Sequence, residues 1–266
     1  MDLELTGRVA LITGGSRGIG KAVARALAEE GCDVAIAARD RERLTAAATE
    51  IASATGRKVI GFQVDTGDDA SVIAMVAEVV AAFGRIDILV NNAAVAGGQG
   101  PVPNLAAITE AAFWADMNVK VMGYLRCARE VAPQMKAAGW GRIINVSGLA
   151  ARQAGSPIGS MRNVAVAAMT KNLADELGPF GINVTVVHPG LTRTEATAGV
   201  VASRATAAGV TSDEIERRMA EGNVVRRIID AREVADVVTF LASPKSGAIT
   251  GDAIAVGGGA PRAIHY

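Results

Sequence analysis

The stretch Thr13-Gly14-Gly15-Ser16-Arg17-Gly18-Ile19-Gly20 follows an apolar run at residues 9–12 and leads into an alanine-rich helical pattern at 21–27. A second apolar run at 33–38 completes a predicted unit of strand, helix and parallel strand. Glycine has no Cβ, so this turn brings backbone N–H groups and the positive end of a helix close to a bound phosphate. We therefore expect a dinucleotide-phosphate site here; a tight strand-to-helix turn without a ligand is the alternative.

The same alternation continues to the end of the chain. Helical patterns separate five further apolar runs, at residues 59–64, 87–90, 142–146, 183–187 and 252–256. Because these runs are apolar on successive residues, helices should cover both faces of a parallel sheet. No linker rich in proline, serine or charge divides the chain. The sequence predicts an α/β fold, a Rossmann-like doubly wound sandwich that forms a single domain over residues 1–266.

Charge and cysteine content narrow the class of partner. Lysine plus arginine and aspartate plus glutamate each number 27, so the formal net charge is zero and no overall field attracts nucleic acid or an anionic membrane. We expect a small-molecule substrate instead. The first apolar run fits a strand, not a signal peptide or membrane span, so a cytoplasmic location is expected. Cys32 and Cys127 have no metal-ligand or redox spacing; both are expected to be buried and reduced, with no metal site.

Residues 191–223 break the alternation. They show little apolar periodicity, carry many Thr, Ala and Gly, and follow a strand that ends in His188-Pro189-Gly190. Loops after the carboxyl ends of parallel strands form the ligand crevice of doubly wound sheets. This segment is therefore a candidate mobile lid over the substrate; an exposed loop with short helices and no function is the alternative.

Several other segments occur in an order and spacing typical of one known family. They are residues 13–20, Asp65-Thr66, Asn91-Asn92-Ala93-Ala94, Asn118, Asn145-Val146-Ser147, 173–178, His188-Pro189-Gly190 and 233–241. On these segments the chain resembles the short-chain dehydrogenase/reductase family over nearly its whole length. The resemblance implies an oxidoreductase with a seven-stranded parallel sheet, assembled as a homotetramer or dimer, that transfers hydride between a nicotinamide and a hydroxyl or carbonyl group.

The resemblance also implies how the cofactor is held. Gly14, Gly18 and Gly20 match the family's phosphate-loop glycines, Asp65 matches the acceptor for the adenine amine, and Asn91 lies at a strand end near the ribose. The full set of expected cofactor-binding residues is Gly14, Ser16, Arg17, Gly18, Ile19, Gly20, Arg39, Asp65, Asn91, Ala93, Pro189, Gly190, Thr192 and Thr194.

The residues after the second strand indicate which nicotinamide cofactor binds. A carboxylate there would hold a free 2′-hydroxyl and repel a 2′-phosphate. Here Ala38 stands at that place, and Arg39 and Arg17 can both donate charge-assisted hydrogen bonds to a phosphate. We expect NADP in preference to NAD. The alternative is that Arg39 only caps a solvated turn. The nearby carboxylate of Asp40 could then make the expected preference for NADP wrong.

The expected catalytic residues are incomplete. The family uses a tyrosine as general acid or base and a lysine four residues later; aligned from residues 165–174, these positions fall on Gly159 and Asn163. Glycine has no proton to give, and a neutral amide offers no positive charge. Ser147 and Asn118 match the family's serine and asparagine, although a glycine follows Ser147 where a second serine is common. His188 is a candidate substitute acid, with a structural histidine as the alternative.

Two functions remain open from the sequence. One is an NADP-dependent oxidoreductase with an unusual proton donor, whose substrate Arg162 could anchor through a carboxylate or phosphate. The other is a catalytically impaired relative that binds a dinucleotide for a structural or regulatory purpose. Arg162 pointing to solvent or to a subunit interface is equally open, and His265 and Tyr266 either reach a neighbouring subunit's pocket or form a disordered tail.

Overall fold

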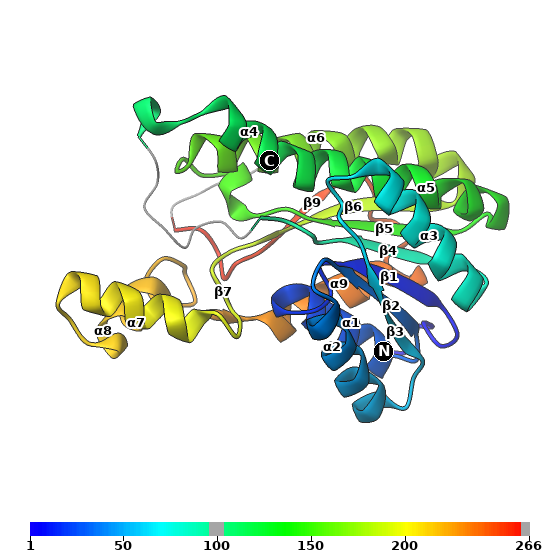
Figure 1. The fold of residues 1–266 in the computed structure, drawn as a ribbon, viewed down its shortest axis with the longest axis horizontal. Helices are drawn as coiled ribbons and strands as arrows, with labels where there is room; N and C mark the ends of the chain where they lie inside the picture. The colour runs from blue at the N-terminus through cyan, green and yellow to red at the C-terminus, as the bar shows by residue number, and fades with distance from the viewer. Residues whose placement is uncertain (96–103, 262–266) are drawn as a thin grey trace.

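A computed structural model describes residues 1–95 and 104–261 of the chain (Figure 1). Seven parallel strands form the main sheet in the order β3-β2-β1-β4-β5-β6-β9. They are β1 (Val9–Thr13), β2 (Asp33–Ala38), β3 (Val59–Gln63), β4 (Ile88–Asn91), β5 (Gly141–Val146), β6 (Ile182–Pro189) and β9 (Ala253–Val256). The predicted Rossmann-like fold with a seven-stranded parallel sheet is confirmed. His265 and Tyr266 lie outside the described residues.

Helices cover both faces of this sheet, as the unbroken apolar runs require (Figure 1). One face packs against α1 (Gly18–Glu29), α2 (Arg41–Thr55) and α9 (Ala231–Ala242). The other packs against α3 (Asp69–Phe83), α5 (Gly123–Ala138) and α6 (Pro157–Leu177). Neighbouring strand residues belong to opposite faces: Ile12 joins the first core and Leu11 the second. A short helix, α4 (Glu110–Met117), continues through a π-helical turn, Asn118–Met122, into α5.

Asp87 shows why β4 begins one residue later than the apolar run that predicted it. It was expected to begin a strand, but β4 begins at Ile88. The side chain of Asp87 is only 3% exposed, and its Oδ2 accepts a hydrogen bond of 2.9 Å from the backbone N–H of Val9. Its Oδ1 accepts from the guanidinium groups of Arg85, at 3.0 Å, and Arg8, at 3.4 Å. A carboxylate thus fixes the start of β1 beside the start of β4.

Residues 191–223 are largely helical. They form the short strand β7 (Thr192–Arg193), α7 (Thr197–Ala208) and α8 (Ser212–Ala220), and β7 pairs with β8 (Ile229–Asp230). The two helices extend away from the main sheet (Figure 1). They share a small core of Val201, Ala205 and Ile215, which explains the weak apolar periodicity. The single domain and the role of this segment as a lid stay predictions.

The structure also bears on the cysteines, on membrane-spanning helices and on metal sites. Cys32 and Cys127 are free and buried, as expected, and burial raises the pKa of each thiol to about 12. Within the described residues, none of the helices has both the length and the apolar character needed to cross a membrane. The same part of the chain contains no group of three or more His, Cys, Asp or Glu placed to hold a metal ion.

Candidate dinucleotide and active site

A cavity of about 1130 Å³ lies along the carboxyl edge of the sheet. It is lined by the glycine turn, by residues that follow β2, β3, β4 and β6, and by parts of α7 and α8. Of the predicted cofactor residues, those that line it are Gly14, Ser16, Arg17, Gly18, Ile19, Arg39, Asp65, Ala93, Gly190, Thr192 and Thr194. Gly20, Asn91 and Pro189 do not line it.

The glycine turn places the start of α1 at this cavity. Gly14 and Gly18 have φ values of +68° and +55°, which side chains rarely adopt. α1 begins at Gly18, and no side chain of its N-cap residue, Arg17, accepts a hydrogen bond from the first turn. Instead, the backbone N–H of Gly18 donates to the carboxylate of Glu195, at 3.0 Å. An anion is therefore bound at this helix end, which is where a phosphate group fits.

Asn92 braces the turn from the end of β4. Its Nδ2 donates to the carbonyl oxygens of Thr13 and Gly14, both at 3.2 Å, and Asn92 lines the cavity. Asn91, the residue expected near the ribose, is fully buried, and its Nδ2 donates to Asn145 Oδ1 at 3.0 Å. Sequence reasoning missed the structural role of Asn92, although it stands in the same Asn91-Asn92-Ala93-Ala94 motif.

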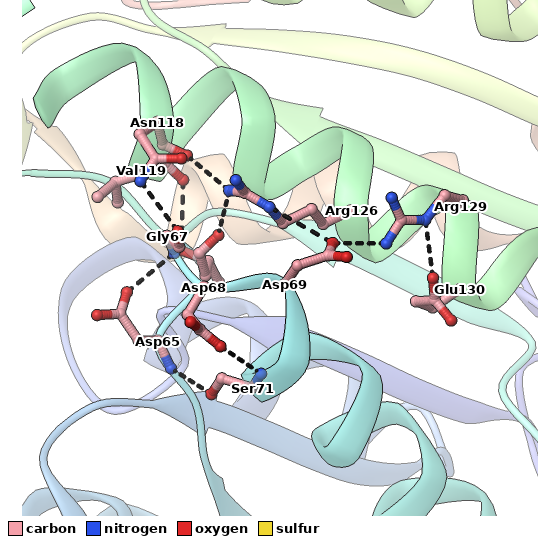
Figure 2. A network of polar contacts seen from close by, with 11 residues as sticks. Asp65, Gly67, Asp68, Asp69, Ser71, Asn118, Val119, Arg126, Arg129 and Glu130 are labelled. Atoms are coloured by element: carbon pink, nitrogen blue, oxygen red, sulfur yellow. Dashed lines mark hydrogen bonds and ion pairs between the residues drawn. The ribbon is translucent and has the colours of Figure 1, made fainter. Parts of the chain in front are cut away.

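Figure 2 shows how the loop after β3 is tied to the π-helical turn. Asp65 Oδ1 accepts from the backbone N–H of Gly67 at 2.9 Å, and Asn118 Nδ2 donates to the carbonyl of Gly67, also at 2.9 Å. Arg126 donates to the carbonyl of Asn118 at 3.3 Å and pairs with Asp69. The side-chain amide of Asn118 thus positions the loop that carries Asp65.

A buried polar cluster lies at the end of β5. Ser147 Oγ donates to the carbonyl of Asn163, on α6, at 3.0 Å. Lys120, from the π-helical turn, donates from Nζ to the carbonyl of Ser147 at 2.9 Å and to Asn163 Oδ1 at 3.0 Å. All three side chains are at most 9% exposed. The sequence analysis missed Lys120; a lysine inside the otherwise apolar run 119–122 was the available signal.

The surroundings of His188, Tyr124 and Arg162 restrict what each of these side chains can do. His188, on β6, is 1% exposed and does not line the cavity; burial, with Arg152 and Lys120 nearby, lowers its pKa to about 4. Its imidazole is therefore neutral at pH 7. Tyr124 donates its hydroxyl to the carbonyl of Val146 at 2.8 Å, and burial raises its pKa. Arg162 pairs with Asp116 of its own chain.

These features define an α/β protein with a nucleotide-sized cleft at the carboxyl edge of its sheet. The family model for enoyl-(acyl carrier protein) reductase matches residues 14–261. The chain is 36% identical over 254 residues to the short-chain reductase protein NovJ of Streptomyces niveus, covering 95% of this chain and 94% of that one. It is 33% identical over 262 residues to the 3-oxoacyl-[acyl-carrier-protein] reductase FabG of Aquifex aeolicus, covering 97% and 99%.

A solved structure agrees with these relatives. L-sorbose reductase from Gluconobacter frateurii, complexed with NADPH and L-sorbose, superimposes with a TM-score of 0.93 at 31% identity, covering 99% of this chain and 100% of that one. The chain belongs to the short-chain dehydrogenase/reductase family of NAD(P)-dependent oxidoreductases.

Proposed function

We propose that this chain uses NADP(H) to transfer a hydride between the nicotinamide and the carbonyl or hydroxyl group of a small molecule. The observation that carries the proposal is that the start of α1, Arg17 and Arg39 line the same cavity. The structural relative L-sorbose reductase, complexed with NADPH, supports the same choice of cofactor. When bound, the nicotinamide supplies the hydride; the protein's part is to hold, orient and protonate.

The described residues fit such a cofactor. The N–H groups at the start of α1 would hold the pyrophosphate, since the N–H of Gly18 already donates to a carboxylate, whereas the N–H groups of Gly14 and Gly15 donate to the carbonyl of Ala37. Asp65 would accept from the adenine amine. Asp40 also lines the cavity, but its carboxylate accepts from the N–H of Arg43 at 3.0 Å and pairs with the Arg43 guanidinium at 3.1 Å. Asp40 caps α2, so its carboxylate is already paired and does not hold the ribose 2′-hydroxyl. We therefore propose that Arg39 and Arg17 bind the 2′-phosphate of NADP(H).

Replacing Arg39 by alanine is expected to raise the NADPH dissociation constant about tenfold, because a charge-assisted hydrogen bond to a phosphate contributes roughly 1.5 kcal/mol. NADH lacks the 2′-phosphate, so its affinity should change less than twofold. Fluorescence titration with both nucleotides measures the ratio. Arg25→Ala, on the exposed part of α1 where Arg25 pairs with Glu29, is the matched control and should leave both constants unchanged. Wild-type protein that binds NADH more tightly than NADPH would contradict the assignment.

We propose further that the active site is atypical, with Gly159 and Asn163 at the family's tyrosine and lysine positions. Asn118 and Ser147 would keep their family roles, and His188 is the remaining candidate from the sequence. Residues 191–223 would act as a lid on the single domain, since Val200, Arg204 and Met219 of that segment help to line the cavity.

Turnover separates this proposal from its alternative, a dinucleotide-binding relative with a regulatory or structural role. Glycine at residue 159 and asparagine at residue 163 favour that second candidate, because the family's usual proton donor and lysine are then missing. NADPH absorbance should fall only when a carbonyl substrate is added; a 3-oxoacyl thioester and L-sorbose are suitable probes because relatives are named for such substrates. NADPH binding without oxidation by either probe, or by a wider panel of ketones, would favour the alternative.

Assembly as a homotetramer or dimer and a cytoplasmic location stay predictions. Exposed apolar side chains on α4, the π-helical turn and α6 support self-association; they are Trp114, Met122, Met161 and Val164.

A further inference from the structure

Lys120 is a buried lysine. In the described residues, no carboxylate oxygen lies within 4 Å of its ammonium group, so it has no ion-pair partner there. Only 4% of it is exposed, and its Nζ donates to two neutral oxygens, the carbonyl of Ser147 and Oδ1 of Asn163. Burying an ammonium group costs several kcal/mol unless a carboxylate compensates it. A methionine would fill the same space at lower cost, so packing alone does not account for a lysine here.

The location of this amine is defined by three elements. Val119, the preceding residue of the π-helical turn, lines the dinucleotide cavity. Ser147 follows β5, which lies in the sheet between β4 and β6, and residues after both of those strands also line the cavity. π-Helical turns inside helices are found frequently at functional sites. Lys120 does not itself line the cavity; its amine lies beside the end of β5, at the edge of the sheet where ligands of doubly wound folds bind.

The charged groups around Lys120 favour an amine that loses its proton readily. Burial, together with Arg162 on α6, lowers the pKa of Lys120 to about 7, while Asp116 on α4 acts in the opposite direction. His188 on β6 is neutral at this pH. An acid whose pKa lies near the working pH is the most effective proton donor.

α6 carries no side chain at Gly159, the place of the family's tyrosine. Gly159 lies one turn before Asn163 on the same helical face, and a Cβ there would contact only Ser156 among the described residues. An ammonium has three N–H bonds, and in the described part of the chain two of them meet acceptors, so one is available.

We propose that Lys120 is the proton donor of this site and that it acts from the π-helical turn in place of the residues absent from α6. The inference rests on the proposed function. In the reduction, the carbonyl carbon receives the hydride of NADPH, and the electron pair of the C=O π bond moves to oxygen. The N–H bond of the Lys120 ammonium breaks and its proton passes to that oxygen. The neutral amine then regains a proton from solvent.

The first test is turnover with whichever probe the wild-type protein reduces fastest. K120M is expected to lower kcat by at least about 100-fold, since positioned proton transfer contributes 10² to 10⁴ in rate. Its NADPH dissociation constant should stay within twofold, and its Tm should hold or rise because a buried charge is removed. K120R should be equally inactive, because arginine keeps its proton at all working pH values. K171M is the matched control, since Lys171 is an exposed lysine on α6 paired with Asp175.

The pH profile adds a readout that a structural role would not move. The wild-type kcat for reduction should fall as the pH rises through about 7, because the protonated amine is the active form, and K171M should keep this profile. A K120M variant within threefold of the wild-type kcat, or a K120R variant that restores activity, would overturn the assignment while leaving the proposed function intact. A lower Tm with unchanged kcat would identify Lys120 as structural.

The second test does not depend on turnover. In protein labelled with ¹³C at the lysine ε-carbon, one resonance should titrate near pH 7, be absent from K120M, and shift when NADPH saturates the protein. Wild-type protein that binds NADPH but reduces no probe would contradict the proposed function. In that case the titration would still show whether Lys120 has a lowered pKa and responds to NADPH. If no lysine resonance titrates below about pH 9, or if NADPH leaves it unchanged, the inference is wrong whatever the activity.

Discussion

A Gly20→Ala variant is expected to bind NADPH at least about 100-fold more weakly than the wild-type protein, a loss of roughly 2.7 kcal/mol. A Cβ at residue 20 would overlap the carbonyl oxygen of Gly14 and lie 2.5 Å from Asn92 Nδ2. Both are parts of the turn itself, so the turn must open. The added methyl group does not line the cavity, and the loss would come from displaced N–H groups that no longer converge on the pyrophosphate.

Fluorescence titration with NADPH measures this loss, and a thermal unfolding curve shows whether the variant remains folded. Gly178→Ala is the matched control, because Gly178 has a φ of −53° and a Cβ there would contact nothing within 4 Å. That variant should bind NADPH like the wild type. A dissociation constant for Gly20→Ala within threefold of the wild-type value would show that the turn does not hold the phosphates.

Replacing Asp87 by alanine is expected to lower the free energy of unfolding by about 3 kcal/mol. The substitution leaves the buried N–H of Val9 without its acceptor and removes the carboxylate that binds Arg8 and Arg85. Arg8 also stacks on the Trp140 ring, 3.9 Å from its centroid, so the effect should extend to the neighbouring strand β5. Urea unfolding followed by circular dichroism measures the change.

Asp87→Asn keeps an oxygen that can accept from Val9, and about half of the loss should be recovered. Asp175→Ala is the control: its carboxylate is exposed and pairs with Lys171 one helical turn away, a contact that contributes less than about 0.5 kcal/mol. If Asp87→Ala were no less stable than Asp175→Ala, the carboxylate would not be what fixes β1 beside β4.

The sheet could be predicted because each strand is marked by a pattern within its own short stretch of sequence. The inner strands are buried on both faces, so an apolar run marks each of them, while the edge strands β3 and β9 are only partly buried. The glycine turn specifies how the first strand enters its helix. The limits of β4 could not be predicted, because they depend on Asp87 pairing with a residue far away in the sequence. α7 and α8 were missed for a different reason: they bury few apolar residues, so their helical period is weak.

The active-site region was predicted less completely. Ser147 and Asn163 could be found by alignment, but the contact of both with Lys120 depends on the way α4 continues into α5 through a π-helical turn. The apolar neighbours of Lys120 were a local signal, but they do not indicate its partners, because those partners come from the end of β5 and from α6. The role of Asn92 was not predicted because two adjacent asparagines at a strand end have different partners. Asn91 binds Asn145, and Asn92 binds the glycine turn.

The carboxylate of Glu195 at the start of α1 has a consequence for how the protein exchanges its nucleotide. In the proposed function, a pyrophosphate would compete with this carboxylate for the N–H of Gly18, so nucleotide binding would replace an internal anion by an external one. Glu195 lies two residues before α7. Nucleotide occupancy and the position of α7 would then be thermodynamically linked, and a change that stabilises the contact between Glu195 and Gly18 should weaken nucleotide affinity.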